Sequence, residues 1–255
     1  MLLEGTDGML EVLVAGEGPA VVMIPSLGRG AEDFADLAGR LAAGGYTALR
    51  PQPRGLGRST ASLGDVSMDD LADDVATIVR TLELAPATIV GHAFGNRVAR
   101  MTATLHGDVV ESVVLLACGG RVAPASEHVQ ALREVFDPEL SDEEHLAAVR
   151  TAFFAPGNDA SIWFDGWNGV VAAVQSKANA RTSVERWWEA GSAEVLVVQP
   201  LEDVIAPPGN ATQIVEAIGD RASMATVAGA GHALLPEQPD EVARILLDWL
   251  TSRWA

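Results

Sequence analysis

Cysteine and positive charge are scarce in this sequence. Cys118 is the one cysteine among 255 residues, so the chain cannot form an internal disulfide. No group of histidines, cysteines and acidic residues has the spacing of metal ligands, and we expect neither a metal nor an organic cofactor. The fold must therefore be stabilised by packing.

The 17 lysine and arginine residues are outnumbered by 35 acidic residues, which leaves a formal net charge of -18. This charge repels phosphate backbones and argues against nucleic acid as a partner. Long apolar runs are also missing: none could cross a bilayer, and residues 1–5 lack the basic and apolar segments of a secretion signal. We expect a cytoplasmic protein with no membrane partner, and nothing in the composition indicates its oligomeric state.

What the sequence does have is an alternation of strand and helix patterns. Residues 2–4 and 10–14, with a turn at Asp7-Gly8, predict an antiparallel hairpin at one edge. The apolar run Ala20–Ile24 predicts a strand covered on both faces. Further strands are predicted over 46–49, 88–90, 109–117, 193–198 and 224–227, and helices over 34–41, 71–82 with Ser67 as cap, 96–101 and 242–250. The pattern indicates an α/β fold with a mostly parallel sheet and helices on both faces.

The segment 119–191 interrupts this alternation, because its pattern is helical throughout. We interpret it as a helical cap inserted into a core formed by residues 1–118 and 192–255. It holds eight of the thirteen aromatic residues of the chain, namely Phe136, Phe153, Phe154, Trp163, Phe164, Trp167, Trp187 and Trp188. Most of them are expected to pack the cap onto the core, and Trp163 and Trp167 are our candidates for contact with a substrate.

The turn Gly91-His92-Ala93-Phe94-Gly95 lies between a predicted buried strand and a predicted helix. Small residues on both sides of the turn let the backbone pass closely and force the middle side chain outward. This sequence resembles the α/β-hydrolase family over essentially its whole length, in the serine hydrolase branch with a helical cap. The resemblance implies that Ala93 occupies the position at which the family carries its serine nucleophile.

The family order of nucleophile, acid and histidine is also kept. Asp203 follows the predicted strand 195–198 and precedes Val204-Ile205-Ala206-Pro207, so the resemblance implies that it is the triad acid, with Glu202 as the neighbour to test as a substitute. His232 in Gly229-Ala230-Gly231-His232-Ala233 is similar to the family's catalytic histidine. The remaining histidines, His92, His106, His128 and His145, have no such placement and are expected on the surface or in packing.

By the same resemblance, the backbone N–H groups of Leu27 and Phe94 would form the oxyanion hole. The chain departs from its relatives just before Leu27, where it has Pro25-Ser26 instead of His-Gly. Ser26 is therefore a candidate ligand contact, with a loop-capping hydroxyl as the simpler interpretation. The segment 53–59 resembles a family loop whose role is structural.

Alanine at position 93 excludes covalent catalysis there, because a methyl group can neither be deprotonated nor attack a carbonyl. One interpretation is that a parent enzyme carries serine and that alanine was introduced to stop turnover. The other is that the protein has no nucleophile and binds a ligand, or directs His232 and Asp203 at water or at a substrate proton. The first is favoured, since a retained acid and histidine serve little purpose in a pure binder.

The parent activity implied by the resemblance is hydrolysis of a carboxylic ester or lactone, with a small, largely apolar substrate. Hydrolysis of carbon–carbon bonds, cofactor-free lyase or oxygenase chemistry, and receptor-like binding are the alternatives, because fold alone does not choose among them. Four basic residues, Arg121, Lys177, Arg181 and Arg186, could meet a substrate carboxylate, although a solvated surface position is the expected one for each.

Overall fold

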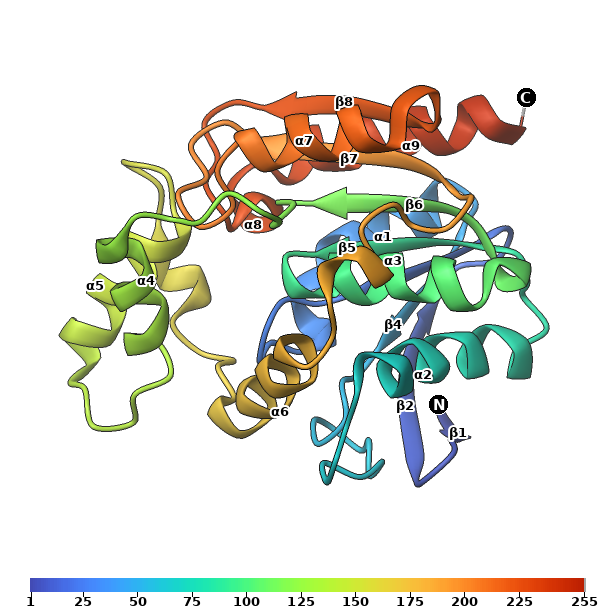
Figure 1. The fold of residues 1–255 in the computed structure, drawn as a ribbon, viewed down its shortest axis with the longest axis horizontal. Helices are drawn as coiled ribbons and strands as arrows, with labels where there is room; N and C mark the ends of the chain where they lie inside the picture. Colours follow the sequence, from blue (N-terminus) through green and yellow to red (C-terminus); the bar gives the residue numbers. More distant parts are fainter. Residues whose placement is uncertain (255) are drawn as a thin grey trace.

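A single eight-stranded sheet forms the centre of the protein (Figure 1). The structure is a computed structural model and describes residues 1–254. The strand order is β1-β2-β4-β3-β5-β6-β7-β8. The two pairs β1·β2 and β2·β4 are antiparallel, and all other neighbours are parallel. The strands are β1 (Leu2–Glu4), β2 (Met9–Ala15), β3 (Ala20–Ile24), β4 (Thr47–Pro51), β5 (Ala87–His92), β6 (Val110–Leu116), β7 (Glu194–Pro200) and β8 (Ala222–Val227).

Helices cover both faces of this sheet (Figure 1). One layer contains α2 (Met68–Thr81), α3 (Phe94–Leu105) and α7 (Gly209–Ile218); the other contains α1 (Ala35–Ala43) and α9 (Pro239–Trp254). Alternate strand residues feed the two cores: Val22 packs with the first layer and Val21 with the second. The predicted α/β architecture is confirmed, with α7 as a helix that the sequence patterns did not predict.

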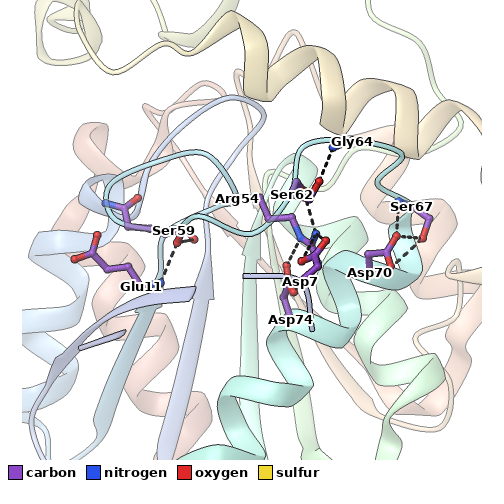
Figure 2. Close-up of polar contacts among 10 residues, drawn as sticks. Asp7, Glu11, Arg54, Ser59, Ser62, Gly64, Ser67, Asp70 and Asp74 are labelled. Carbon is purple, nitrogen blue, oxygen red and sulfur yellow. Dashed lines mark hydrogen bonds and ion pairs between the residues drawn. The ribbon is translucent and has the colours of Figure 1, made fainter. Parts of the chain in front are cut away.

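The predicted helix start at Ser67 is confirmed. The Ser67 side chain accepts from the Asp70 backbone N–H, and the Asp70 carboxylate accepts in return from the Ser67 backbone N–H at 2.8 Å. This reciprocal capping satisfies two of the four free donors at the start of α2. It fixes the point at which the loop after β4 enters the helix (Figure 2).

The loop that follows β4 is held by a buried arginine (Figure 2). Arg54 donates to Asp74 on α2 through two bonds of 2.6 and 2.8 Å and to Asp7 in the β1–β2 turn at 2.9 Å. A further bond, to the Ser62 carbonyl at 3.1 Å, fixes the loop itself. A bidentate pair of this kind fixes orientation as well as charge, so this loop has the structural role expected of it.

Between β6 and β7 the chain forms helices only. These are α4 (Ser126–Glu134), α5 (Asp142–Phe153) and α6 (Gly169–Ala180), with short 3-10 turns at Ala160–Trp163 and Val184–Arg186. Figure 1 shows α4 and α5, in green and yellow, beyond the carboxyl ends of the strands. Their shared apolar core includes Val149, Phe153 and Trp163 and also Ala233 from the loop after β8. All of these helices lie within the residues interpreted as a cap.

No helix within residues 1–254 combines the length and the apolar character that a membrane span requires.

Candidate active site

The turn between β5 and α3 is tightly constrained around Ala93. Ala93 has φ +51° and ψ -108°, a backbone conformation that residues other than glycine rarely adopt. Its N–H donates to the Leu116 carbonyl at 3.0 Å, which holds the turn against β6. A Cβ on Gly91 or on Gly95 would lie within 3.0 Å of backbone atoms, so both positions require glycine. Strain of this kind at a strand-to-helix turn is typical of a functional site.

Asp203 and His232 form a buried hydrogen-bonded pair. The two residues lie 29 positions apart in sequence, and the distance from His232 Nδ1 to Asp203 Oδ2 is 2.9 Å. A carboxylate can only accept, so Nδ1 carries the hydrogen and donates it. In the neutral ring, Nε2 is then the unprotonated nitrogen that can take a proton.

The loop after β7 orients the Asp203 carboxylate. Its Oδ1 accepts from the backbone N–H groups of Ile205 at 2.9 Å and Ala206 at 2.7 Å. The neighbouring carboxylate, Glu202, is exposed and accepts instead from the N–H groups of Gly229 and Ala230, both at 3.2 Å. Asp203 and not Glu202 therefore contacts the histidine.

The loop that carries His232 is attached to the cap through Glu237. This carboxylate accepts from the Gly231 N–H at 2.7 Å, from the Ala155 N–H at 2.7 Å and from the Asn158 amide at 2.6 Å. Burial raises the pKa of Glu237, while the three donors act in the opposite direction. One side chain thus connects the histidine loop with the segment that follows α5.

His92 packs against His232, with the ring centroids 5.3 Å apart, and has no exposed surface. Its Nε2 lies 2.8 Å from the His232 carbonyl oxygen, so this nitrogen carries the hydrogen and donates it. Burial, and secondarily the charge of His232, lower the pKa of His92 to about 3, and the ring is neutral at physiological pH. The sequence placed His92 among the histidines expected on the surface or in packing, and it did not predict this contact with the loop that carries His232.

Ala93 and His232 line the same cavity. Its volume is about 250 Å³, just below the usual range of small-molecule pockets, about 300–1,000 Å³. The wall is mainly apolar, with Leu27, Phe94, Leu132, Phe136, Phe153, Trp167, Ile205 and Ala206. Its polar lining residues other than His232 are Ser26, Arg97, Ser176 and Asn179. Such a cavity fits a small molecule with an apolar body and one or two polar groups.

The two expected oxyanion donors lie on this wall. Within residues 1–254, neither the Leu27 nor the Phe94 backbone N–H donates to another backbone group in a turn or loop. The loop around Leu27 is fixed from the cap side, because the Gly28 N–H donates to Gln175 Oε1 on α6 at 2.8 Å. Ser26 is 4% exposed and also lines the cavity.

Comparison with known proteins identifies the family. The sequence profile described as the alpha/beta hydrolase family matches residues 21–245, which is most of the chain. The protein belongs to the alpha/beta hydrolase family.

Three similar proteins show the range of this protein's relatives. A non-heme haloperoxidase of Rhodococcus erythropolis is 26% identical over 231 residues, covering 82% of this chain and 83% of the relative. The structure of an esterase from Exiguobacterium antarcticum has a TM-score of 0.83 at 18% identity, with 98% of each chain covered. An enol-lactonase from Burkholderia xenovorans has a TM-score of 0.82 at 22% identity, covering 98% of this chain and 100% of the other. These likenesses confirm the α/β-hydrolase fold.

The two tryptophans proposed from the sequence as substrate contacts, Trp163 and Trp167, differ in position. Trp167 lines the cavity beside Ala93, whereas Trp163 does not and instead packs its ring against His92 at a centroid distance of 5.8 Å. The Arg29 guanidinium contacts both indole rings, at 4.5 and 4.4 Å from their centroids. The layer formed by Arg29, Trp163 and Trp167 therefore joins the loop after β3 to the cap.

A second, larger cavity of about 870 Å³ lies on the other side of this layer. It shares Trp167 with the first cavity, but Ala93 and His232 do not line it. Ala93 and His232 therefore line only the smaller of these two cavities. Within residues 1–254, no cluster of three or more histidine, cysteine or acidic side chains could hold a metal ion.

The basic residues considered for a substrate carboxylate are all exposed and paired. Lys177 and Arg181 contact Asp65, Arg186 contacts Asp69, and Arg121 contacts Glu185. The arginine that lines the cavity is Arg97, which sequence reasoning missed. Its position in the sequence could have predicted this, because Arg97 lies four residues after Ala93 on the helix that begins at the turn, and residues four apart share one face of a helix.

Proposed function

We propose that the protein is a hydrolase of carboxylic esters or lactones that works by a Ser-His-Asp mechanism, and that Ala93 replaces its nucleophile. The observation that carries this proposal is the buried Asp203–His232 pair, which borders the same cavity as the strained turn at Ala93. A pair oriented for proton transfer beside an outward-facing turn position is the arrangement that acyl transfer needs. The esterase and enol-lactonase among the similar structures agree with this choice of bond.

In the form with serine at position 93, the hydroxyl oxygen attacks the carbonyl carbon and its proton passes to His232 Nε2. Asp203 stabilises the imidazolium that forms. The N–H groups of Leu27 and Phe94 stabilise the negative oxygen of the tetrahedral intermediate. The carbon–oxygen bond to the leaving group then breaks, and the leaving oxygen takes the proton from His232.

A second passage through the same groups completes the reaction. Water gives a proton to His232 Nε2 and attacks the acyl carbon, and the acid is released as the serine oxygen recovers that proton. No step needs a metal or an organic cofactor. With alanine at position 93 the first attack cannot occur, so the present chain is expected to be inactive.

The test is the substitution Ala93→Ser, assayed on a panel of esters and lactones. Gaining the nucleophile should raise turnover by about 10⁶, as its loss costs in a related mechanism. The double variant with His232→Ala serves as the control and should return turnover to the level of the Ala93 chain. Hydrolysis of no panel member by a folded Ala93→Ser variant would overturn the proposal.

Receptor-like binding is the second candidate function. The specific observation in its favour is Ala93 itself, a side chain without chemistry on the wall of an otherwise complete cavity. Saturable binding of an ester to both the Ala93 chain and the Ala93→Ser variant, with no product from either, would favour it. Carbon–carbon hydrolysis would be detected as cleavage of 1,3-dicarbonyl compounds, with uptake of one water, by an Ala93→Ser variant that leaves esters intact. Cofactor-free lyase chemistry would instead release two products from one substrate without uptake of water.

A further inference from the structure

Arg97 differs from the other cavity-lining residues because it carries a charge without a counterion. It lies on α3, one turn beyond Ala93, and is partly buried. Its Nε is enclosed and has no acceptor, and within residues 1–254 Arg97 forms no hydrogen bond or ion pair. By contrast, Arg29 and Arg54 are buried as well, but each pairs with an aspartate at 2.6 Å.

The surroundings of Arg97 contain no carboxylate that could take this role. The centroid of the Trp187 ring lies 5.7 Å from its guanidinium carbon, and the buried Cys118 is near enough for its charge to affect the pKa of Arg97. The next arginine along the helix, Arg100, is a second cation. Its Nη2 donates to neutral acceptors, Asn96 Oδ1 at 2.7 Å and the Gly119 carbonyl at 3.2 Å, and its Nη1 is buried without a partner among the described residues. Two like charges therefore lie close together without an acidic partner.

Burial lowers the pKa of Arg97, although a guanidinium stays protonated at neutral pH. Placing an unpaired charge in a partly desolvated site costs free energy, and an anion that enters the site recovers it. The cavity is enclosed on the cap side by Ser176 and Asn179, and the Asn179 side-chain oxygen is also buried without a partner among the described residues. The polar groups of this wall are thus incomplete in the protein alone.

We propose that Arg97 binds a carboxylate group of the substrate, so that the preferred ester or lactone carries a free carboxylate on a small apolar body. The kinetic part of this inference rests on the proposed hydrolase function, whereas the binding part does not. Arg97 would donate two parallel N–H bonds to the carboxylate, and this contact would select anionic substrates over neutral ones of the same shape. The negative net charge of the protein makes such a local cation the main source of attraction for an anion.

The binding test uses the Ala93 chain, which cannot consume an ester. Monomethyl glutarate and dimethyl glutarate carry the same ester group and differ in one carboxylate, and their affinities can be compared by titration calorimetry. We expect the monoester to bind about 10- to 100-fold more tightly, which is the range for a charge-assisted hydrogen bond. Equal affinities for the two probes, or saturable binding of neither, would overturn the inference.

The variants assign the selectivity to one side chain. Arg97→Met keeps most of the length of the side chain without its charge and should abolish the preference for the monoester, whereas Arg97→Lys should keep part of it. Arg186→Met removes an exposed arginine that pairs with Asp69 outside the cavity and should leave the preference unchanged. Thermal unfolding of each variant verifies folding, and a preference that survives in folded Arg97→Met would overturn the inference.

Turnover separates the two proposals. If Ala93→Ser hydrolyses both esters with equal kcat/KM, the hydrolase function holds and the role of Arg97 is wrong. If Ala93→Ser hydrolyses neither but the binding preference depends on Arg97, the anion site holds and the hydrolase function is wrong. Both hold if the monoester is preferred in turnover and Arg97→Met reduces that ratio by at least about tenfold.

Discussion

His92 donates a hydrogen bond of 2.8 Å to the backbone carbonyl of His232, although 140 residues separate them in sequence. The residue before the turn at Ala93 thereby fixes the backbone of the loop that presents the imidazole. The ring of His92 also contacts Trp163 of the cap. His92 is therefore a positioning residue that connects strand β5, the histidine loop and the cap.

This burial predicts a pH-dependent stability. The pKa of His92 falls from 6.5 to about 3 in the folded protein, chiefly because burial disfavours the charged ring. Between these two values the unfolded chain binds a proton that the folded protein does not, so the free energy of unfolding should decrease as the pH falls from 6.5 toward 3. For one proton the slope is at most about 1.4 kcal/mol per pH unit.

Urea unfolding of the Ala93 chain and of its His92→Gln variant at several pH values between 4 and 7 measures this slope. Glutamine keeps an N–H donor but does not titrate, so the variant should lose the part of the pH dependence of unfolding that comes from His92. Glu237 acts with the opposite sign, because its pKa is raised by burial and its protonation favours the folded state as the pH falls. The difference between the two proteins isolates His92, and identical slopes would contradict the prediction.

The roles of the two neighbouring carboxylates can be separated in the Ala93→Ser form. Asp203→Asn should reduce kcat by about 10⁴, because an amide cannot stabilise the imidazolium and favours the wrong tautomer of His232. Glu202→Gln keeps one acceptor oxygen for the Gly229 and Ala230 N–H groups, which donate to different oxygens of the carboxylate, and should change kcat/KM by no more than about twofold. Steady-state kinetics on one ester decides this, and a larger loss in Glu202→Gln than in Asp203→Asn would reverse the assignment.

Much of this arrangement could be predicted from local sequence. A strand covered on both faces has to be a continuous apolar run, as in Ala20–Ile24. Ser67 marks the start of α2 because a serine side chain can accept from a free N–H of the first helical turn. The turn at Ala93 requires glycine on both sides. The order of the segments around Ala93, Asp203 and His232 then indicated which carboxylate and which histidine would meet. These features depend on residues that are neighbours in sequence or on the order of nucleophile, acid and histidine in the family, so the sequence alone could predict them.

The roles of Arg97, His92 and Glu237 could not be predicted in the same way. Whether a charge such as that of Arg97 has a carboxylate partner depends on residues that are distant in sequence. No local sequence pattern shows that Arg97 has none. His92 and Glu237 act through backbone groups, whose positions the sequence does not show. For Trp163 and Trp167, four residues apart, only the packing of the cap decides which ring reaches the cavity.

Glu237 is expected to matter for both stability and substrate binding. Replacing it with alanine leaves three donors without their acceptor, including the Gly231 and Ala155 N–H groups. Each partly buried, unsatisfied donor costs about 1–3 kcal/mol unless water replaces the carboxylate, so we expect a loss of about 2–4 kcal/mol in the free energy of unfolding.

The same substitution releases the cap from the histidine loop and should raise KM in the Ala93→Ser form. Chemical denaturation and steady-state kinetics test the two effects. Glu237→Gln retains one acceptor oxygen and serves as the intermediate variant. If Glu237→Ala has the same free energy of unfolding as the chain with Glu237, the hydrogen bonds of this carboxylate contribute nothing to stability.

Gly95 should tolerate no side chain, because α3 begins directly against the end of β3. A Cβ at this position would lie within 3.0 Å of the carbonyl oxygens of Ile24 and Pro25. These are rigid backbone atoms, so Gly95→Ala has to displace the helix from the strand, at a cost of about 3 kcal/mol, the upper end of the usual range for overpacking. Gly107→Ala is the matched control, since no heavy atom outside its neighbours lies within 4 Å of its Cβ, and alanine there should be neutral or slightly stabilising.

This close approach also has a consequence for the reaction. It brings the Phe94 N–H at the start of α3 near the segment that leads from Pro25 to the Leu27 N–H, so the separation of the two proposed oxyanion donors depends on Gly95. In the Ala93→Ser form, Gly95→Ala should therefore lower kcat more than it raises KM, by about 10² or more, the cost of one lost oxyanion donor. Thermal unfolding and kinetics measured below the melting temperature separate this loss from unfolding, and an unchanged kcat in the folded variant would show that the donors do not depend on this contact.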